Sequence, residues 1–318
     1  MTGGHVARPG ELVTPGRIGL YALMTTIWGS SFFFTALALR AFNPFLLVQL
    51  RMVLATVVLG LVVVLTRRRL PQTRRLWGHF VVLGLISIAM PYTLLTWAQV
   101  WVNSSTAIVL SSTTPIFVFL FATFVTRAEK FSTLRLVGIV LAFGGVVLLT
   151  AGGGGGGGWF WPVVIVVTSA VYAVANIYTR TFVSSVDPIM VAFLQLGFGM
   201  LWLAPVTTMT GSWHVEDLGL IPLIAVLELG ILGSAFAYVL FFYFIRTWGS
   251  TATSMNTYLQ PAVGVLLGVV VLHERPSATG WIALAIILAG VIVFGASRMP
   301  WGRRMVVPER VGSADLTS

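Results

Sequence analysis

Charged residues are scarce in this chain of 318 residues: Asp, Glu, Lys and Arg together make up 9%, whereas hydrophobic residues make up 57%. An ordinary soluble domain carries about 25% charged residues. A chain this apolar cannot cover a water-soluble globule with polar groups, which argues against an ordinary soluble protein. It suits a lipid bilayer, where helices of about 20 apolar residues span the hydrocarbon core.

Cysteine is absent, which excludes disulfides, thiolate metal sites and cysteine nucleophiles. The formal net charge is nevertheless +10 at pH 7. On a soluble protein such an excess would suggest a nucleic-acid partner. In a membrane protein it is explained by the enrichment of Arg and Lys in cytoplasmic loops, so we expect no nucleic-acid partner.

Sequence signals of catalysis are missing too. The four histidines form no His–Glu metal spacing, and the glycines at 152–158 lack the Gly-Lys-Ser/Thr ending of an ATP-binding loop. We therefore expect no enzyme, no catalytic residue, no metal and no cofactor. An intramembrane lipid-modifying enzyme stays a minor alternative, because it would need clustered Asp, His or Arg near one face.

Ten apolar runs, separated by short polar segments, follow one another along the chain. They predict an all-α integral membrane protein with ten transmembrane helices. The expected spans are residues 18–38, 44–66, 78–99, 104–126, 134–151, 159–180, 188–209, 219–244, 250–271 and 279–297. Polar tails at 1–17 and 298–318 flank them, and we expect no cleavable signal peptide before the first span.

Basic residues are distributed unevenly around these spans. With the N-terminus in the cytoplasm, all but three of the 19 Lys and Arg residues fall on the cytoplasmic side. The exceptions are Arg40 and Arg275 in outer loops and Arg51 inside the second span. Because such a bias sets orientation, we expect a multi-pass protein of the cytoplasmic membrane with both termini, and so both tails, in the cytoplasm.

The two halves of the chain repeat each other at a nearly constant offset. Residues 105–107 read Ser-Thr-Ala and recur at 250–252, and Glu129 recurs as Glu274, both 145 residues later. Further matches run in the same order at offsets of 144 to 146. The expected units are a five-helix repeat at 18–151, a polyglycine linker at 152–158 and a second five-helix repeat at 159–297.

Each expected repeat has five spans, an odd number, so the second repeat must enter the membrane upside down relative to the first. Inverted repeats generate two related conformations around a midplane site, which is the physical basis of alternating access. A structural scaffold has no need of this symmetry. An internal repeat can also replace a homodimer, so we expect a monomer.

The motifs of the two halves give the chain a family resemblance. The first helix carries Trp28-Gly29-Ser30-Ser31-Phe32, the second carries Leu50-Arg51, and Pro115, Glu129 and Gly145-Val146 have counterparts in the second half. In these features the chain resembles the drug/metabolite transporter superfamily, in particular EamA-type transporters with two EamA domains. The resemblance covers roughly residues 18–297.

The resemblance implies ten helices around a central cavity between the halves, with small metabolites, amino acids or drugs as substrates. It also implies that helices one, three, four, six, eight and nine line the cavity and that helices five and ten are peripheral. The second half departs from the pattern, because Tyr172-Ala173 stands where Trp28-Gly29 stands in the first half, and Gln195 replaces Arg51. The substrate therefore does not follow from the resemblance.

Two charged residues lie inside expected spans and away from the span ends, Glu228 and Arg51. A charge at the bilayer centre costs roughly 2.5–3.5 kcal/mol on insertion scales, so such groups face a cavity or a partner. An isolated carboxyl in a dehydrated setting binds a proton more readily than one in water. We therefore treat both residues as coupling candidates, with a proton as the candidate coupling ion. The alternative is a static ion pair between them.

Two prolines interrupt polar stretches in corresponding spans, Pro115 and Pro261, and we expect helix kinks there. Paired helix breaks with polar neighbours favour a binding site, whereas the plainer interpretation is a tolerated kink with hydroxyls bonded to the helix backbone. Aromatic residues are candidates for the cavity wall, although they are also common at membrane interfaces. The substrate-binding candidates are Trp28, Ser30, Ser31, Tyr92, Trp97, Thr113, Thr114, Tyr172, Asn176, Tyr238, Asn256 and Gln260.

Together these features predict a secondary active transporter that works by alternating access on a small molecule, as an exporter or exchanger. Its expected partners are the substrate and the lipid bilayer. A passive channel or facilitator is the alternative. Glu129 and Glu274 lie at helix ends, where we expect them to pair with neighbouring loops rather than with substrate.

Overall fold

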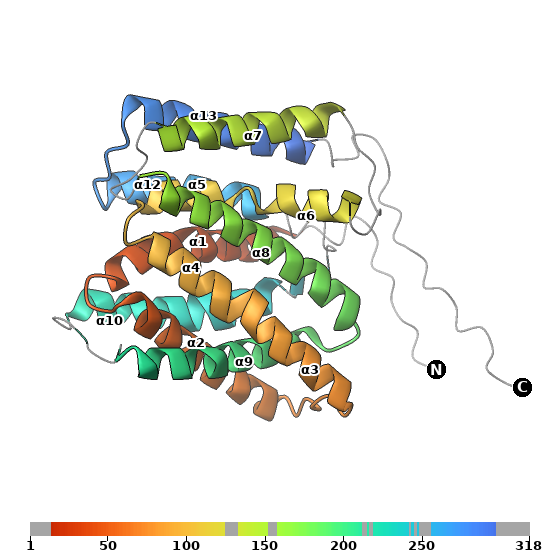
Figure 1. Ribbon diagram of the computed structural model, residues 1–318. Coiled ribbons are helices and arrows are strands. Elements are labelled where there is room, and N and C mark those ends of the chain that lie inside the picture. Colours follow the sequence, from red (N-terminus) through yellow and green to blue (C-terminus); the bar gives the residue numbers. More distant parts are fainter. Residues whose placement is uncertain are drawn as a thin grey trace, which may run out of the picture.

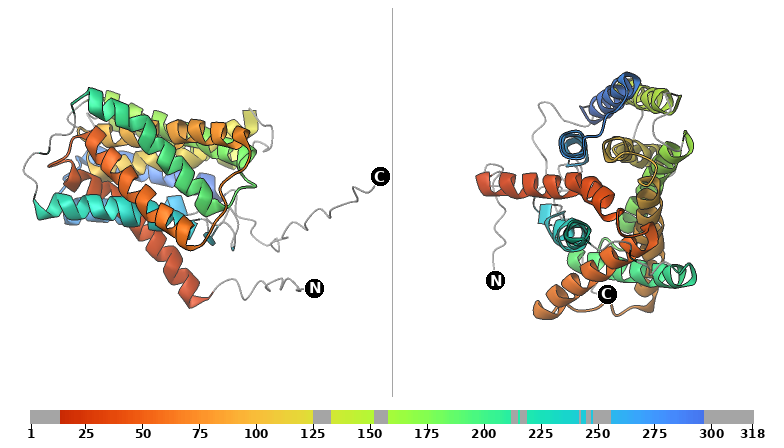
Figure 2. Two further views of the ribbon diagram at one scale, coloured as in Figure 1. Left: turned by 90° about the horizontal axis from the view of Figure 1, so that it is seen from below. Right: turned by 90° about the vertical axis from the view of Figure 1, so that its left-hand side faces the viewer.

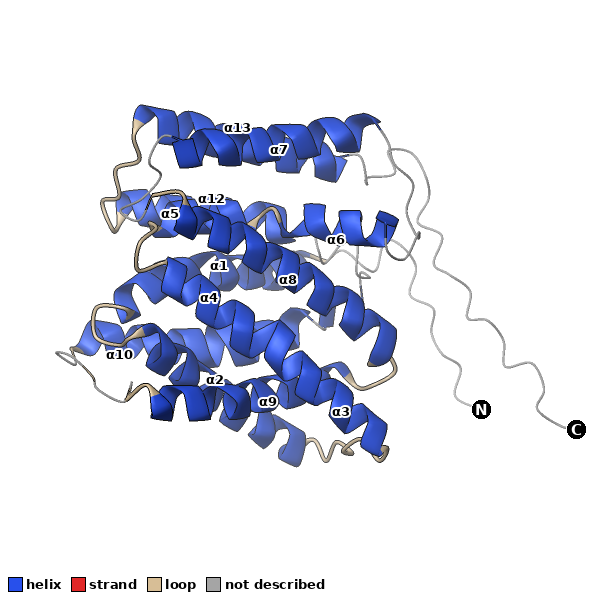
Figure 3. Cartoon of the chain, in the orientation of Figure 1, coloured by secondary structure: helices blue, strands red, loops and turns tan. Residues whose placement is uncertain are grey.

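The computed structural model describes residues 14–124, 133–151, 158–211, 215, 219–241, 243–244, 247 and 256–296. These residues form an all-helical bundle without a named strand; a single β-bridge joins Phe42 and Val215 (Figure 3). Both tails beyond these bounds, most of the polyglycine linker, Glu129 and the Ser-Thr-Ala copy at 250–252 lie outside the described residues.

The helices lie close to the expected spans. Their bounds are α1 Pro15–Ala38, α2 Pro44–Leu65, α3 Arg74–Leu83, η1 Gly84–Ala89, α4 Met90–Ala98, α5 Ser104–Ser111, α6 Thr114–Phe124, α7 Thr133–Ala151, α8 Phe160–Phe182, α9 Pro188–Met209, α10 Leu220–Leu227, η2 Glu228–Phe236, α12 Asn256–Val270 and α13 Ala278–Ala296. The segments η1 and η2 are π-helical turns. The first continues α3 into α4, and the second follows α10 directly.

Among the described residues, seven helices are long and apolar enough to cross a membrane. Three shorter apolar helices, at Thr133–Leu149, Asn256–Val270 and Ala278–Phe294, lie where the fifth, ninth and tenth spans are expected. The protein is therefore an all-helical, multi-pass membrane protein, and the count of ten spans stays a prediction.

Corresponding helices in the two halves begin in the same way. Pro44 is the first residue of α2, and Asn43 before it caps the helix by accepting a hydrogen bond from Leu46 N at 3.1 Å. In the second half Pro188 begins α9, and Asp187 accepts a hydrogen bond from the backbone N–H of Ile189 at 3.0 Å. Proline at the first helical position and Asn or Asp before it both favour a helix start.

The helix bounds follow the offset of the sequence repeat. The bounds Pro44–Leu65 of α2 become those of α9 after a shift of 144 residues, and the bounds of α7 become those of α13 after a shift of 145. The π-helical turns correspond as well, because η1 shifted by 145 falls within η2. These described elements therefore follow one another at the spacing of the sequence repeat.

Helices α7 and α13 pack tightly together at one edge of the bundle (Figures 1 and 2). A Cβ atom on Gly138 would lie 2.7 Å from the backbone oxygen of Gly290, and one on Gly145 would lie 2.9 Å from that of Ala283. Because the contact moves backward along α13 as it moves forward along α7, the two helices run antiparallel. Only glycine allows backbones to approach this closely.

Helices α2 and α9 also run antiparallel. A Cβ atom on Gly60 would lie 3.1 Å from Phe193, and one on Gly197 would lie 3.6 Å from Thr56. Helix α2 packs against η2 and α9 packs against η1, so each helix contacts the π-helical turn of the other half. Two further helix pairs join the halves in the same way: α1 packs against α12, and α8 packs against α6.

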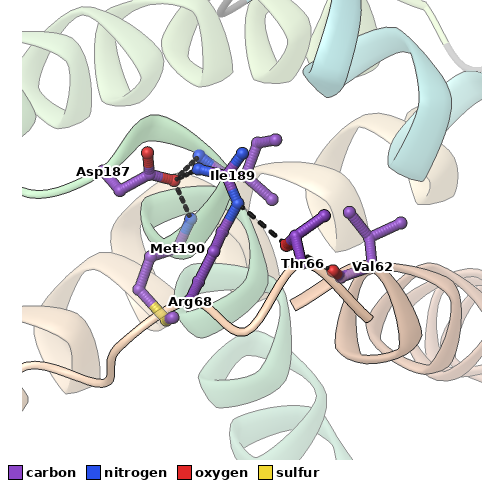
Figure 4. A network of polar contacts seen from close by, with 6 residues as sticks. All are labelled: Val62, Thr66, Arg68, Asp187, Ile189 and Met190. Carbon is purple, nitrogen blue, oxygen red and sulfur yellow. Dashed lines mark hydrogen bonds and ion pairs between the residues drawn. The ribbon is translucent and has the colours of Figure 1, made fainter. Parts of the chain in front are cut away.

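The end of α2 is tied to the start of α9 by an ion pair between Arg68 and Asp187 (Figure 4). Arg68 Nε also donates to Thr66 Oγ1 at 3.1 Å, and the hydroxyl of Thr66 donates to the carbonyl of Val62 at 2.6 Å. Asp187 therefore caps α9 and holds the connection after α2 in place. This contact lies between two segments that the predicted topology puts on the cytoplasmic side.

Candidate functional site

Four aromatic side chains meet between the halves, and we call Trp28, Tyr92, Tyr172 and Tyr238 the aromatic quartet. They come from α1, α4, α8 and the segment after η2, and each is half-buried. Trp28 packs edge-on against Tyr238, with ring centroids 5.9 Å apart at 81°. Tyr92 packs on Tyr172 in the same way, at 6.2 Å and 81°.

The quartet follows the internal repeat. A shift of 144 residues takes Trp28 to Tyr172, and a shift of 146 takes Tyr92 to Tyr238. The two edge-on pairs are therefore counterparts, and each pair joins one residue from either half. A side-chain hydrogen bond between Tyr92 and Tyr238 links the pairs. Residues that the sequence analysis selected separately thus form one pseudo-symmetric cluster.

Arg51 extends from α2 toward this cluster and is 8% exposed. Its Nε donates to the hydroxyl of Ser234 at 2.8 Å, and its guanidinium carbon lies 4.6 Å from the centre of the Tyr92 ring. A guanidinium carries five N–H donors. Within the described part of the chain the four donors on Nη1 and Nη2 have no hydrogen-bond partner. They form the fork that binds carboxylates.

The second half has a neutral version of this contact. Gln195, the counterpart of Arg51, accepts a hydrogen bond from Ser87 in η1 at 3.4 Å, as Arg51 bonds Ser234 in η2. Sequence reasoning missed both serines, which lie 147 residues apart, one residue beyond the offsets of 144 to 146 found elsewhere in the repeat. Each half therefore has a hydrogen bond between a polar residue of α2 or α9 and a serine of a π-helical turn, whereas the positive charge is present only in the first half.

Glu228 is the first residue of η2 and is 9% exposed. Its Oε2 atom is buried and has no hydrogen-bond partner among the described residues. Among the described residues the ion pair present joins Arg68 and Asp187, and Glu228 forms none with Arg51. Their charges are nevertheless close enough to interact electrostatically. Shifts of 145 and 146 residues place Leu83 and Val82 at the counterpart position, so the negative charge is also unique.

The π-helical turn η2 brings these groups together. Ser234 donates its hydroxyl to the carbonyl of Leu229, five residues earlier, at 2.9 Å, and Trp28 Nε1 donates to the carbonyl of Gly233 at 3.0 Å. A Cβ atom on Gly233 would lie 3.0 Å from Ser31 Oγ and 3.6 Å from Arg51 Nη2. Turns of this type are frequent at functional sites.

The serine and threonine candidates bond to their own helices. Ser30 and Ser31 both donate to the carbonyl of Ile27 at 3.0 Å, Thr113 donates to Leu110 at 2.7 Å, and Thr114 to Ser111 at 2.8 Å. Such bonds are the plainer interpretation of these hydroxyls. Ser31 also approaches Gly233, the residue that lies next to Arg51 Nη2.

The two prolines differ in their surroundings. The helix is interrupted just before Pro115, at residues 112–113 between α5 and α6, whereas α12 continues through Pro261. Asn256, at the start of α12, is 1% exposed, and neither side-chain amide atom has a hydrogen-bond partner in the described part of the chain. Gln260 lies one turn further along α12 and is half-buried.

Two further candidates, Trp97 and Asn176, are exposed. Trp97 is 40% exposed and stacks on Trp161 at 6.4 Å. Asn176 is exposed on α8, one turn after Tyr172, and makes no side-chain hydrogen bond with another described residue.

Glu274 ties the loop before α13 to the start of α5. Its carboxylate accepts hydrogen bonds from the backbone N–H of Ser104 at 2.8 Å and of Ser105 at 3.0 Å, and from both serine hydroxyls. A carboxylate at a helix N-terminus is stabilised by the free backbone donors and the helix dipole. A pocket of about 370 Å³ opens beside it, lined by Ala36, residues 99–104 and Glu274 itself.

Across the described ranges, no group of three or more His, Cys, Asp or Glu side chains is placed so that it could hold a metal ion. The features present are helices that cross a membrane and a duplicated polar and aromatic cluster between two halves. They define a polytopic membrane protein whose two halves meet at a polar and aromatic cluster.

The comparisons with known proteins agree with this class. The model of the EamA-like transporter family matches residues 17–151 and again residues 159–296. The chain therefore belongs to the EamA-like transporter family.

Its relatives are similar along nearly their whole length. An uncharacterized transporter of Archaeoglobus fulgidus is 27% identical over 283 residues, covering 88% of this chain and 97% of that protein. The uncharacterized inner membrane transporter YedA of Escherichia coli is 27% identical over 277 residues, covering 86% and 88%. A probable terminal-alkyne amino-acid exporter of Streptantibioticus cattleyicolor is 24% identical, covering 90% and 95%.

A solved crystal structure shares the fold. It superposes with a TM-score of 0.61 at 22% identity and covers 88% of this chain and 96% of that one. At this identity the likeness concerns the arrangement of helices alone.

Proposed function

We propose that this protein is a secondary active transporter that exposes one central site alternately to the two sides of the membrane. The observation that carries the proposal is the aromatic quartet, in which each edge-on pair joins one residue from each half. Both pairs are formed in the observed structure and each bridges the two halves, so a rocking motion of one half against the other would act on the two pairs in equivalent ways. Equivalent sets of contacts with similar energy are what a two-state carrier requires.

The inverted orientation of the halves is part of this proposal. The antiparallel packing of α7 with α13 and of α2 with α9 supports it, because counterpart helices in inverted repeats run in opposite directions. Ten spans with both termini in the cytoplasm complete the arrangement. The positive-inside distribution of arginines supports this orientation.

The cargo is a small metabolite, amino acid or drug-like molecule, and the direction is export or exchange. The name of one relative, a probable terminal-alkyne amino-acid exporter, supports amino acids among these classes. No ATP-binding loop is present in the sequence, so a gradient of ions or of substrate supplies the energy. A monomer suffices, because the second repeat supplies the second half of the site.

Reconstitution of the purified protein into liposomes tests the proposal. A carrier gives saturable uptake of a labelled substrate and faster uptake when unlabelled substrate is present inside, because exchange bypasses the return of the empty carrier. A panel of labelled amino acids and small organic cations is the starting set, and protein-free liposomes are the control. Uptake that rises linearly with concentration and shows no acceleration by internal substrate would instead establish a passive channel.

A further inference from the structure

Arginines are concentrated at the end of the bundle where α2 passes to α3. Residues 67–75 read Arg-Arg-Arg-Leu-Pro-Gln-Thr-Arg-Arg, and the sequence contains no Asp or Glu between Glu11 and Glu129. Arg68 is paired with Asp187. Four others are exposed and form no ion pair within the described ranges: Arg67, Arg69, Arg74 and Arg75. The described part of the chain therefore leaves this positive charge unneutralised.

The local backbone does not favour arginine at three of these positions. Arg67 ends α2 with a φ of 49°, and the N–H of Arg68 after it donates to the carbonyl of Val63 at 3.0 Å. Glycine is the usual residue in this left-handed conformation, because a Cβ atom is strained there. Arg74 and Arg75 lie in the first turn of α3, where a positive charge opposes the helix dipole. Orientation in the membrane needs basic residues on this side, but not at these unfavourable positions.

The loop that carries the arginines is anchored at two points. At its start Arg68 forms the ion pair with Asp187, the residue that caps α9 (Figure 4). Nearer to α3, Trp77 Nε1 donates to the carbonyl of Pro71 at 3.0 Å, and the Trp77 ring packs edge-on against Phe198. An anchored loop loses less conformational freedom when its side chains bind a ligand, which favours affinity.

Large apolar side chains lie exposed beside the arginines. Val64 and Leu65, in the last turn of α2, are both 71% exposed, and Leu70, between the arginines, is 51% exposed. Arginine binds phosphate oxygens with two parallel N–H donors, and exposed apolar side chains at the end of a spanning helix lie against acyl chains. A phospholipid uses both surfaces, whereas a water-soluble phosphate would use the arginines alone.

We infer that residues 64–75 bind an anionic phospholipid, with its phosphate on the exposed arginines and its acyl chains against Val64, Leu65 and Leu70. Helix α2 has 22 residues, about 33 Å at the helical rise per residue. This length matches the hydrocarbon core of a bilayer, so the loop after α2 reaches the level of the lipid headgroups. The bound lipid neutralises like charges beside the ion pair between Arg68 and Asp187, which joins the two halves. This inference is independent of the proposed transport function.

The experiment adds lipid to the purified full chain in detergent and follows thermal unfolding, because a ligand that binds the folded state raises the melting temperature. Three probes separate the sources of phosphate: dioleoylphosphatidylglycerol, dioleoylphosphatidylcholine, which has no net charge, and sn-glycerol 3-phosphate, which has no acyl chains. We expect phosphatidylglycerol to bind about tenfold or more tightly than phosphatidylcholine. Glycerol 3-phosphate should leave the melting temperature unchanged. Added salt should weaken phosphatidylglycerol binding, because exposed charges are screened.

Two double variants assign the contact to the loop, Arg67→Gln with Arg69→Gln and Arg74→Gln with Arg75→Gln. Each should weaken phosphatidylglycerol binding about 25-fold, because each arginine near a charged membrane surface contributes about fivefold. Native mass spectrometry of each variant counts the lipids that it retains. Monodisperse elution in detergent establishes that each variant is folded, and if one of the two does not fold, the other decides.

The matched control is Arg40→Gln with Arg275→Gln, which removes two exposed arginines that the predicted topology places on the opposite side of the membrane. It should leave phosphatidylglycerol binding unchanged. The inference is overturned if phosphatidylcholine binds the wild type as tightly as phosphatidylglycerol, or if the loop variants bind no more weakly than this control. Equal stabilisation by glycerol 3-phosphate would show a site for soluble phosphate and would also overturn it.

Discussion

The carboxylate of Glu274 accepts a hydrogen bond from the backbone N–H of Ser104 at 2.8 Å, which fastens the loop before α13 to the first turn of α5. The contact joins the second repeat to the first beside the pocket that Ala36 lines. Because four donors converge on one carboxylate, its removal leaves the start of α5 without a cap.

Glu274→Ala is therefore expected to open this end of the bundle. Loss of a charge-assisted hydrogen bond of at least about 1.5 kcal/mol shifts an opening equilibrium roughly tenfold. The measurement is the labelling rate of a single cysteine at Ala36, in a chain that has no native cysteine, by a membrane-impermeant maleimide. Glu274→Asp keeps a carboxylate acceptor, so its labelling rate should lie between those of the wild type and Glu274→Ala. Equal rates in wild type and Glu274→Ala would show that the contact does not hold this end closed.

The orientation of the chain in the membrane is tested by reporter fusions. A fusion at Ser318 should report the cytoplasm, and one inserted at Gly154 in the polyglycine linker should report the opposite side. The expectation follows from the arginine distribution, which places nearly all basic residues on one side. An outward C-terminus would overturn both the ten-span arrangement and the inversion.

Single cysteines at Thr114 and Gln260 test the paired-proline hypothesis. Both side chains are half-buried, and we expect water-soluble thiol reagents to reach them and substrate to slow the reaction. A cysteine at Leu266, which is 61% exposed on the same helix as Gln260, is the control. We expect that position to face lipid and to react slowly. Unreactive Thr114 and Gln260 variants would place the substrate path elsewhere.

Glu228→Gln tests whether the carboxylate couples transport to protons. Glutamine preserves the shape of the side chain and cannot exchange a proton, while the neighbouring Arg51, Tyr92 and Tyr238 are unchanged. We expect exchange of labelled for unlabelled substrate to persist and accumulation driven by a proton gradient to vanish. Glu228→Asp, which retains a titrating group, should keep some accumulation. Full accumulation in Glu228→Gln would exclude this coupling.

Neighbouring glycines on α7 offer a matched test of helix packing. A Cβ on Gly145 would lie 2.7 Å from Ile287 Cγ1 and 2.9 Å from the backbone oxygen of Ala283, whereas one on Gly144 would meet nothing within 4 Å. Gly145→Val should therefore destabilise the protein by about 1–3 kcal/mol through overpacking. Gly144→Val should have little effect. Thermal unfolding in detergent measures both, and equal melting temperatures would contradict the antiparallel α7–α13 contact.

The sequence alone was sufficient to predict where most helices lie, because helix formation in a membrane depends on local features of the chain. Apolar runs need lipid and intrahelical hydrogen bonds, and the Asn43-Pro44 and Asp187-Pro188 pairs start helices through caps and a preset backbone angle. The repeat offset was also visible in the sequence. It is reproduced in the bounds of α2 and α9 and of α7 and α13.

The composition of the site was decided only by the tertiary structure. Trp28, Tyr92, Tyr172 and Tyr238 were candidates beside Trp97 and Asn176, and packing between the halves brought the first four together and left the other two exposed. Ser234 and Gly233 joined the site because a π-helical turn redirects them toward Arg51 and Trp28. Such contacts join residues about 200 positions apart, and no local pattern in the chain encodes which of them will meet.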